Sequence, residues 1–256
     1  MTELVNIRQQ TSLKILLIGD DCLDVYQYGT IDRISPEAPV PVFKYSHKEE
    51  IGGMARNVKS NLENLGCEVS YLCGDTSIKT RLIDLRSKQH IVRIDNDQMS
   101  SPISFNTEIP SIYDAVVISD YNKGTVSYDM VRDIINTFKG PVFIDTKKTD
   151  LAQFEGAWVK VNELEYSRLT STCAGLIVTL GSRGTMFNNE IHPATKVEVS
   201  DVCGAGDTFL SALTLQFLLT KDIQKAILFA NIAAGITVQH LGNYAPSYDE
   251  IRRAGY

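Results

Sequence analysis

The sequence predicts an α/β protein with a doubly wound, mostly parallel sheet and a small β lid that projects from it. Short aliphatic runs alternate with helical patterns along most of the chain, which is typical of βαβ units. Residues 25–46 and 79–95 break this alternation and are rich in β-forming residues. Because 256 residues are enough for one large domain, we expect a single domain over residues 1–256, with these two segments as lid strands.

The spacing of apolar residues predicts the elements of the main domain. Bounded aliphatic runs indicate buried strands at residues 14–19, 69–72, 115–119, 142–145 and 175–180. Apolar residues at helical spacing indicate helices at residues 55–65, 129–138, 208–219 and 223–240. Gly66 follows the first helix and Gly140 the second, and glycine is common just after a helix C-terminus.

Prolines and a polar turn characterise the two lid segments. Pro36, Pro39 and Pro41 fall in the first segment, and proline is restricted to edge strands and turns of a sheet. In the second segment, polar residues 86–89 would form the turn of a hairpin. Together the segments would form a small sheet that covers a binding site.

Composition and charge argue against several classes of protein. The net charge of −6 and pI of about 5.3 disfavour a role on nucleic acid or on a membrane surface. The five cysteines are scattered, without a C-x-x-C pair, as expected for reduced thiols rather than disulfides or a zinc site. The N-terminus is polar and of mixed charge, so we expect no signal peptide and a cytoplasmic location.

The most informative motif is D-V-C-G-A-G-D-T-F at residues 201–209, directly before an apolar helix. Gly204 and Gly206 allow the backbone to approach a ligand closely. The free N–H groups of the first helical turn would bind a phosphate or a developing anion. Asp207 could then accept a proton from an alcohol during phosphoryl transfer. The alternative is an ordinary helix start, in which Asp207 is only a favourable capping residue.

A second motif, I-G-G-M-A-R-N-V at residues 51–58, suits a sugar. Gly52 and Gly53 let backbone N–H groups approach hydroxyls, and the Asn57 amide can donate and accept hydrogen bonds. Asp24 follows the first strand, at the edge where open α/β sheets bind ligands. The alternative is ordinary turn chemistry at both places.

A third motif, V-K-V-N-E-L-E-Y at residues 159–166, places Asn162 and Glu165 three residues apart at the start of a helix. On one helical face they could hold Mg²⁺ through water, together with phosphate oxygens. A capping box explains the same spacing equally well.

A fourth motif, V-T-L-G-S-R-G, follows the strand predicted at residues 175–180. Its Thr179, Gly181 and Gly184 would suit a nucleotide, because small residues allow close approach of the backbone. A tight hairpin turn is the alternative.

In order and spacing, the four motifs resemble those of the ribokinase-like (PfkB) carbohydrate kinases, over residues 14–248. R-I-S-P-E-A-P-V-P-V at residues 33–42 and S-D-Y-N-K-G at residues 119–124 resemble the kinase module of the heptose kinases. The resemblance to this kinase module extends to K-T-R at residues 79–81 and V-R-I-D at residues 92–95. Those enzymes phosphorylate the anomeric hydroxyl of D-glycero-D-manno-heptose 7-phosphate with ATP, for lipopolysaccharide synthesis.

The resemblance implies a role for each matching residue. Asp207 would be the base, and Gly204, Ala205 and Gly206 the anion hole. Residues on the ATP and Mg²⁺ side would be Asn162, Glu163, Leu164, Glu165, Thr179, Gly181, Gly184 and Asn231, with Glu165 reaching the metal through water. The sugar would be held by Asp24, Gly52, Gly53, Asn57 and Lys123, and its phosphate by Arg33 and Arg81. The lid often forms a homodimer contact in this family.

The chain also departs from the family. Only residues 75–77 stand where the family has a helix and a strand, and a helical segment is missing between residues 169 and 175. Cys203, Val161 and Thr146 replace a threonine and two prolines of the family motifs. Because these losses lie near the sugar pocket, two alternatives stay open. One is a kinase for another sugar or a nucleoside, and the other is a non-catalytic sensor or scaffold that binds the same ligands.

Overall fold

The computed structural model describes residues 12–104, 109 and 111–255. Residues 1–11, for which the sequence analysis expects no signal peptide, lie outside the described residues. Within the described part, no helix is long and apolar enough to cross a membrane.

Ten strands of the described chain form one sheet, in the order β10-β9-β8-β7-β6-β5-β1-β3-β4, with β2 also paired to β1. The strands are β1 (Lys14–Ile34), β2 (Pro41–Met54), β3 (Glu68–Asp84), β4 (His90–Asn96), β5 (Ala115–Asp120), β6 (Val142–Thr146), β7 (Trp158–Asn162), β8 (Leu176–Thr179), β9 (Thr185–Phe187) and β10 (Glu190–His192). The strands from β3 through β1 to β8 pair in parallel, and β2, β4, β9 and β10 pair antiparallel. The predicted, mostly parallel sheet is therefore confirmed.

Helices cover both faces of this sheet. The longer helices are α1 (Ala55–Asn64), α2 (Tyr128–Thr137), α4 (Ala205–Thr220) and α5 (Ile223–Thr237), and the short ones are α3 (Glu163–Tyr166) and α6 (Tyr248–Arg253). Alternate residues of β1 enter different cores: Ile15 and Leu17 pack with α1, α4 and α5, whereas Leu16 and Ile18 pack with α2. This alternation follows from the two-residue period of a strand and confirms the doubly wound arrangement.

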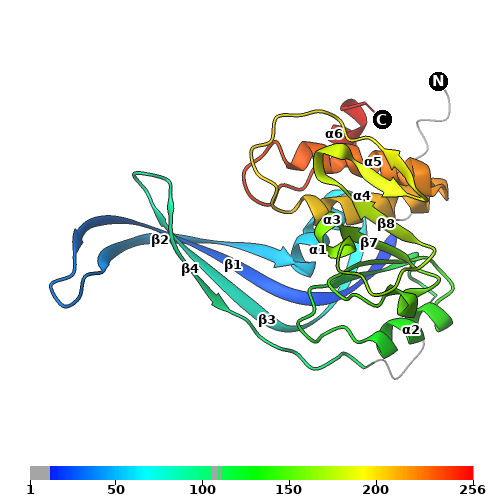
Figure 1. Ribbon diagram of the computed structural model, residues 1–256, viewed down its shortest axis with the longest axis horizontal. Coiled ribbons are helices and arrows are strands. Elements are labelled where there is room, and N and C mark those ends of the chain that lie inside the picture. The colour runs from blue at the N-terminus through cyan, green and yellow to red at the C-terminus, as the bar shows by residue number, and fades with distance from the viewer. Residues whose placement is uncertain (1–11, 105–108, 110, 256) are drawn as a thin grey trace.

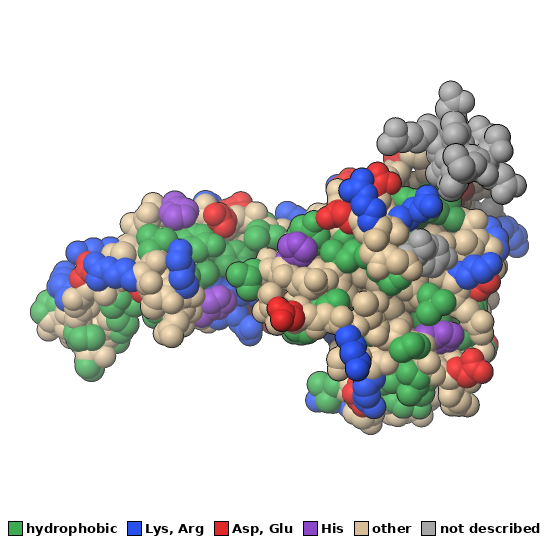
Figure 2. Space-filling view, turned by 90° about the horizontal axis from the view of Figure 1, so that it is seen from above, with side chains coloured by type: hydrophobic (Ala, Val, Ile, Leu, Met, Phe, Trp, Pro, Cys, Tyr) green, Lys and Arg blue, Asp and Glu red, His purple; other side chains and the backbone are tan. Residues whose placement is uncertain are grey.

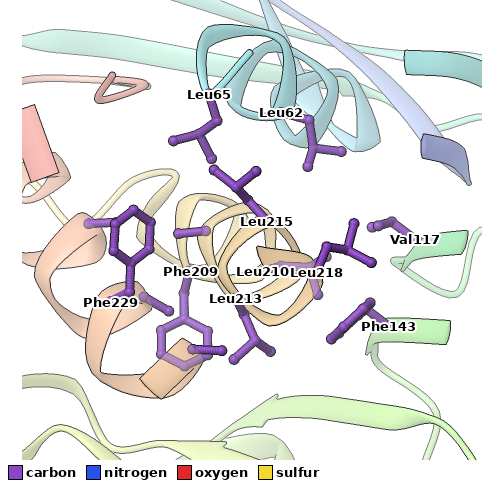
Figure 3. Packing of buried hydrophobic residues seen from close by; sticks show 14 of the residues in the cluster. Leu62, Leu65, Val117, Phe143, Phe209, Leu210, Leu213, Leu215, Leu218 and Phe229 are labelled. Atoms are coloured by element: carbon purple, nitrogen blue, oxygen red, sulfur yellow. The ribbon is translucent and has the colours of Figure 1, made fainter. Parts of the chain in front are cut away.

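Helix α4 is the centre of the larger core (Figure 3). Its Phe209, Leu215 and Leu218 are buried on different sides of the helix, toward α5, α1 and the sheet respectively. A helix that is apolar on all sides is stable only when it is covered on all sides. The packing fixes the N-terminus of α4, and with it the motif at residues 201–209, relative to the sheet.

The lid is an extension of the sheet formed by β1 to β4, and it projects from the body (Figure 1). The predicted strand at residues 14–19 is much too short, because β1 continues into the extension as far as Ile34. Likewise, β3 runs without a break through residues 69–72 and on to Asp84. With only residues 75–77 between the two predicted strands, the chain has no length for a helix and continues as one strand.

Asp20 marks the point at which the extension separates from the body. Before it, β1 pairs with β5 up to Gly19, and after it β1 pairs with β2 from Asp21 onward. The buried Asp20 carboxylate accepts hydrogen bonds from the backbone N–H groups of Tyr121, Lys123 and Thr125, in the loop after β5. The sheet thus divides at the carboxyl end of its strands, where open α/β sheets bind ligands.

Candidate active site

A cavity of about 1120 Å³ lies over the ends of β6, β7 and β8 and the N-terminus of α4. All four predicted catalytic residues line it, as do all of the predicted nucleotide-side residues except Glu165. The lining residues that carry the following argument are Tyr121, Asp145, Lys160, Gly204, Gly206 and Asp207. Its volume is in the range of small-molecule sites.

The Asp207 carboxylate lies in the wall of this cavity and is held by two donors. Asn57 Nδ2 donates to Asp207 Oδ2 across 2.7 Å, and the Tyr121 hydroxyl donates to Oδ1 across 3.2 Å. Asn57 comes from α1 and Tyr121 from the loop after β5, so three separate elements fix one carboxylate. Asp207 is buried, with 6% of its surface exposed.

The pKa of Asp207 is raised to about 6, chiefly by burial and in addition by the charge of the Asp145 carboxylate. The hydrogen bonds from Asn57 and Tyr121 and the Lys160 ammonium act in the opposite direction. At pH 7 most of the carboxylates are therefore ionised, yet their pKa is close enough to neutrality for proton transfer in both directions. A buried base of this kind fits an acid–base role better than a capping role alone.

The first turn of α4 is the predicted anion seat. Gly204 is its N-cap in the left-handed conformation, with φ of 74°, and the helix begins at Ala205. The prediction of a start at residue 208 is therefore wrong by three residues. As a consequence, the N–H groups of residues 205–207 belong to the first turn, where they have no partner within the helix. Asp207 is thus a first-turn residue directly beside these N–H groups.

Most of the predicted nucleotide-side residues also line the cavity, and the structural alternatives for both of their motifs are present as well. Asn162 and Glu165 make a complete capping box at the start of α3, and the T-x-G-x-x-G segment connects the antiparallel strands β8 and β9. Asn162, Thr179, Gly181 and Gly184 nonetheless face the cavity. Capping and ligand contact are therefore compatible at these positions.

Asn231 of α5 also reaches the cavity wall, and its amide is already engaged. Its Nδ2 donates to the His192 carbonyl across 3.0 Å, and its Oδ1 accepts from Thr185 Oγ1 across 2.6 Å. Asn231 therefore fixes the β9–β10 hairpin against α5 and forms part of the cavity lining.

Glu165 was predicted to reach Mg²⁺ through water. One of its oxygens accepts from its capping partner, the Asn162 backbone N–H, across 2.7 Å, and the other accepts from Lys147 Nζ. Among the described residues, no group of three or more His, Cys, Asp or Glu side chains could enclose a metal ion. Mg²⁺ commonly keeps several waters and binds substrate phosphates, so this arrangement fits a metal that arrives with the nucleotide.

The predicted sugar residues lie on the other side of Asp207, at the base of the extension. Asp24 pairs with Arg81, and a β-carbon at Gly53 would lie only 2.5 Å from Asp24 Oδ2. The Gly52 carbonyl accepts a hydrogen bond from Asn243. The structure thus brings Asp24, Arg81, Gly52 and Gly53 to one place, and Asn57 of the adjoining helix connects it to Asp207.

Two further predicted residues lie apart from this group. Lys123 Nζ forms an ion pair with Asp97 at 2.6 Å. Arg33 is exposed near the distal end of β1 and does not line the cavity. The expectation that Arg33 holds a substrate phosphate therefore finds no support within one chain, because the length of β1 carries it to the far end of the extension (Figure 1).

Among the cavity residues that the sequence analysis missed, three lie beside the proposed base: Tyr121, Asp145 and Lys160. The first two stand at or just after the carboxyl ends of predicted strands, which is where ligand-binding residues concentrate. Lys160 interrupts the aliphatic sequence of β7 and is 4% exposed. A lysine between two valines of a buried strand is the signal that could have identified it.

Comparison with known proteins agrees with these motifs. The pattern of the pfkB family carbohydrate kinases matches residues 151–250. The bifunctional protein HldE of Campylobacter curvus is 34% identical over 302 residues, covering 93% of this chain. The chain spans 64% of the length of that relative.

Solved structures show the same fold at lower identity. Ribokinase from Thermotoga maritima has a TM-score of 0.67 at 18% identity, covering 94% of this chain and 99% of its own. Phosphofructokinase-2 from Escherichia coli has a TM-score of 0.70 at 14% identity, covering 95% and 98%. The fold is therefore ribokinase-like, as predicted.

Proposed function

Since this chain belongs to the pfkB family of carbohydrate kinases, we propose that it transfers the γ-phosphoryl group of ATP to a sugar hydroxyl at Asp207. The observation that carries this proposal is the position of the Asp207 carboxylate, in a cavity wall beside the first turn of α4. A base next to an anion seat is the arrangement that phosphoryl transfer to an alcohol requires.

In the proposed reaction, Asp207 accepts the proton of the sugar hydroxyl. The hydroxyl oxygen forms a bond to the γ-phosphorus, the bond from that phosphorus to the β–γ bridging oxygen breaks, and ADP leaves. Asn57 and Tyr121 orient the carboxylate through their hydrogen bonds. The N–H groups of residues 204–207 stabilise the charge that develops on the phosphoryl oxygens.

The nucleotide would occupy the cavity side formed by Asn162, Thr179, Gly181, Gly184 and Asn231. Small residues in this wall leave room for the base and ribose. Mg²⁺ bound with ATP would offset phosphate charge, with Glu165 as a water-mediated contact. Such a reaction fits the cytoplasm, where ATP and reduced thiols are found.

As acceptor we propose D-glycero-D-manno-heptose 7-phosphate, phosphorylated at its anomeric hydroxyl. The support is the resemblance of residues 33–42 and 119–124 to heptose kinases, together with the similarity to HldE proteins. Arg81, which is paired with Asp24, and Lys123, which is paired with Asp97, are candidate cations for the phosphate of this acceptor. Another sugar or a nucleoside is the alternative acceptor.

We propose that the extension joins two copies of the chain as a homodimer. Hydrophobic side chains lie along its surface (Figure 2). Exposed members include Ile34, Val40, Tyr45, Val92 and Ile94. Contiguous apolar surface of this kind marks protein interfaces. In such a dimer, Arg33 of one copy could lie near the active site of the other copy, although it does not reach the site of its own chain.

A second candidate function is binding without turnover, as in a sensor or scaffold. It is favoured by the internal ion pairs of Arg81 with Asp24, Lys123 with Asp97 and Lys147 with Glu165. These pairs occupy the charged groups that a phosphorylated ligand would need. Ligand-dependent shifts of the melting temperature without ADP formation would support this candidate.

A coupled assay of ADP release separates the two candidates. The purified chain is incubated with Mg²⁺, ATP and a panel of sugars, sugar phosphates and nucleosides, beginning with heptose 7-phosphate. The proposal predicts acceptor-dependent ADP release, fastest with heptose 7-phosphate. Release with another acceptor alone would keep the kinase and discard the heptose, whereas no release with any acceptor would discard the kinase.

A further inference from the structure

Lys160 and Asp145 form an ion pair inside the cavity wall, next to the proposed base. They are register partners on the neighbouring strands β7 and β6, and Lys160 Nζ lies 2.7 Å from Asp145 Oδ2. Only 5% and 6% of the two side chains are exposed. Such a pair is costly to bury, because both ions lose their hydration, and it adds little stability compared with an apolar pair. Its presence beside Asp207 therefore points to a role in the chemistry.

Lys160 remains a cation in this position. Burial alone would lower the pKa of its ammonium, but the charge and hydrogen bond of Asp145, together with the charges of Asp207 and Glu165, raise the pKa overall. Within the described part of the chain, Asp145 is the single hydrogen-bond partner of Nζ, and Asp145 Oδ1 has none. An ammonium has three N–H donors, so two remain for a ligand.

The ammonium lies directly against the anion seat. A β-carbon at Gly206 would lie 2.8 Å from Lys160 Nζ and 3.9 Å from Asp145 Oδ2. The missing side chain of Gly206 is therefore what admits the lysine to the first turn of α4. Lys160 and the N–H groups of this turn converge on the same region of the cavity.

We propose that Lys160 is a catalytic residue whose ammonium binds an oxygen of the γ-phosphoryl group during its transfer, and that Asp145 is the residue that positions it. The inference rests on the proposed kinase function. The lysine adds a fixed positive charge to the anion seat, where preformed donors stabilise the transition state most effectively. Since the γ-phosphoryl group is also present in bound ATP, the contact must appear in binding as well as in turnover.

The test compares the affinities of AMP-PNP and ADP, each with Mg²⁺, by titration calorimetry. In Lys160→Met we expect the affinity for AMP-PNP to fall at least about tenfold while that for ADP stays within about twofold. Where an acceptor supports turnover, kcat should fall about 10²–10³-fold, the range for loss of one such donor. Lys225→Met, which removes an exposed lysine that does not line the cavity, is the matched control and should bind as wild type.

Loss of Lys160 alone leaves Asp145 as an unpaired buried carboxylate, which could impair folding. The double variant Asp145→Asn/Lys160→Met removes both charges and keeps the test valid, because it should fold and still lose the preference for AMP-PNP. Equal weakening of both nucleotides, or no weakening, would overturn the proposal. The binding comparison needs no sugar, so it judges the role of Lys160 in phosphate binding independently of turnover. If the chain released no ADP with any acceptor, the kinase proposal would fail, but the binding result would still decide the role of Lys160.

Discussion

Asn57 Nδ2 donates a hydrogen bond across 2.7 Å to Asp207 Oδ2, and this contact joins two motifs that are 150 residues apart in the sequence. One motif was assigned to the sugar and the other to the phosphoryl group. In the proposed function, the two substrates therefore meet at the Asp207 carboxylate. It also makes Asn57 a regulator of the basicity of that carboxylate.

The first prediction concerns the pH dependence of the rate in Asn57→Leu. The Asn57 hydrogen bond lowers the pKa of Asp207, so its loss should raise that pKa above about 6. Because the base must be deprotonated, the acidic limb of kcat/KM should move to higher pH, with a larger loss of rate at pH 6 than at pH 8. The profile is measured from pH 5 to 9. Tyr121, Asp145 and Lys160, which also face the carboxylate, remain unchanged.

Asn64→Leu is the matched control, since Asn64 lies on the same helix and its side chain donates a hydrogen bond to the Ala245 carbonyl. Its profile should coincide with that of the wild type. An acidic limb that stays in place in Asn57→Leu would show that Asn57 does not tune the base.

A second prediction concerns stability. Asp207 has a pKa of about 6 in the folded chain against 3.8 for the free side chain, so the folded state binds the proton more tightly. The stability that the folded state gains from protonated Asp207 is complete below about pH 4 and is lost as pH rises through about 6. Asp207→Asn should therefore be more stable than wild type at pH 7 to 8, by roughly 3 kcal/mol at most, and equal to it near pH 4. Urea unfolding at both pH values measures this, and an equal difference at both would contradict the assignment.

The third prediction compares two glycines. In Gly206→Ala the new methyl group would meet Lys160 Nζ at 2.8 Å, so the lysine must move and turnover should fall. Gly235 lies in the interior of α5 with open space at its β-carbon position. Gly235→Ala should therefore raise stability by about 0.5–1 kcal/mol. Thermal melts measure the stability of Gly235→Ala, and ADP release measures the turnover of Gly206→Ala. Wild-type turnover in Gly206→Ala would show that the close contact between Gly206 and Lys160 is not needed for the reaction.

A fourth prediction concerns the extension. Ile94 of β4 has 55% of its surface exposed, and a lysine there should disrupt an apolar dimer contact. Sedimentation velocity should show a dimer for the wild type and a monomer for Ile94→Lys. Leu241→Lys changes an 83% exposed leucine outside the extension and should remain dimeric. A wild type that is monomeric at all concentrations would refute the interface.

The sequence was sufficient for most elements of the main domain because each of these carries its own local signal, whereas the strands β7, β9 and β10 were not predicted. Aliphatic runs found the buried parts of β1, β5, β6 and β8, and glycine marked the end of α1. The lengths of β1 and β3 were not predictable in this way. They continue beyond the body because each pairs with β2 or β4, and such pairing is set by distant parts of the chain.

The same limit explains which site residues were found. Short motifs of neighbouring residues identified Gly204 to Asp207 and Asn162, because such motifs can be recognised in the sequence itself. The Lys160–Asp145 pair depends on the register of β6 against β7, and Tyr121 reaches Asp207 only through the loop that Asp20 holds. Arg33 shows the reverse case, in which a motif suggested a contact that one chain does not support, because the length of β1 carries Arg33 away from the cavity.

The role of Asp207 as the base is tested most directly by ADP release from Asp207→Asn with the best acceptor, alongside AMP-PNP binding to the same variant. A positioned base contributes about 10²–10⁴ to the rate, so turnover should fall at least ~100-fold while nucleotide affinity stays near that of the wild type. Retention of more than half of the activity would contradict the account, because the carboxylate at the centre of the site would then have no part in the reaction.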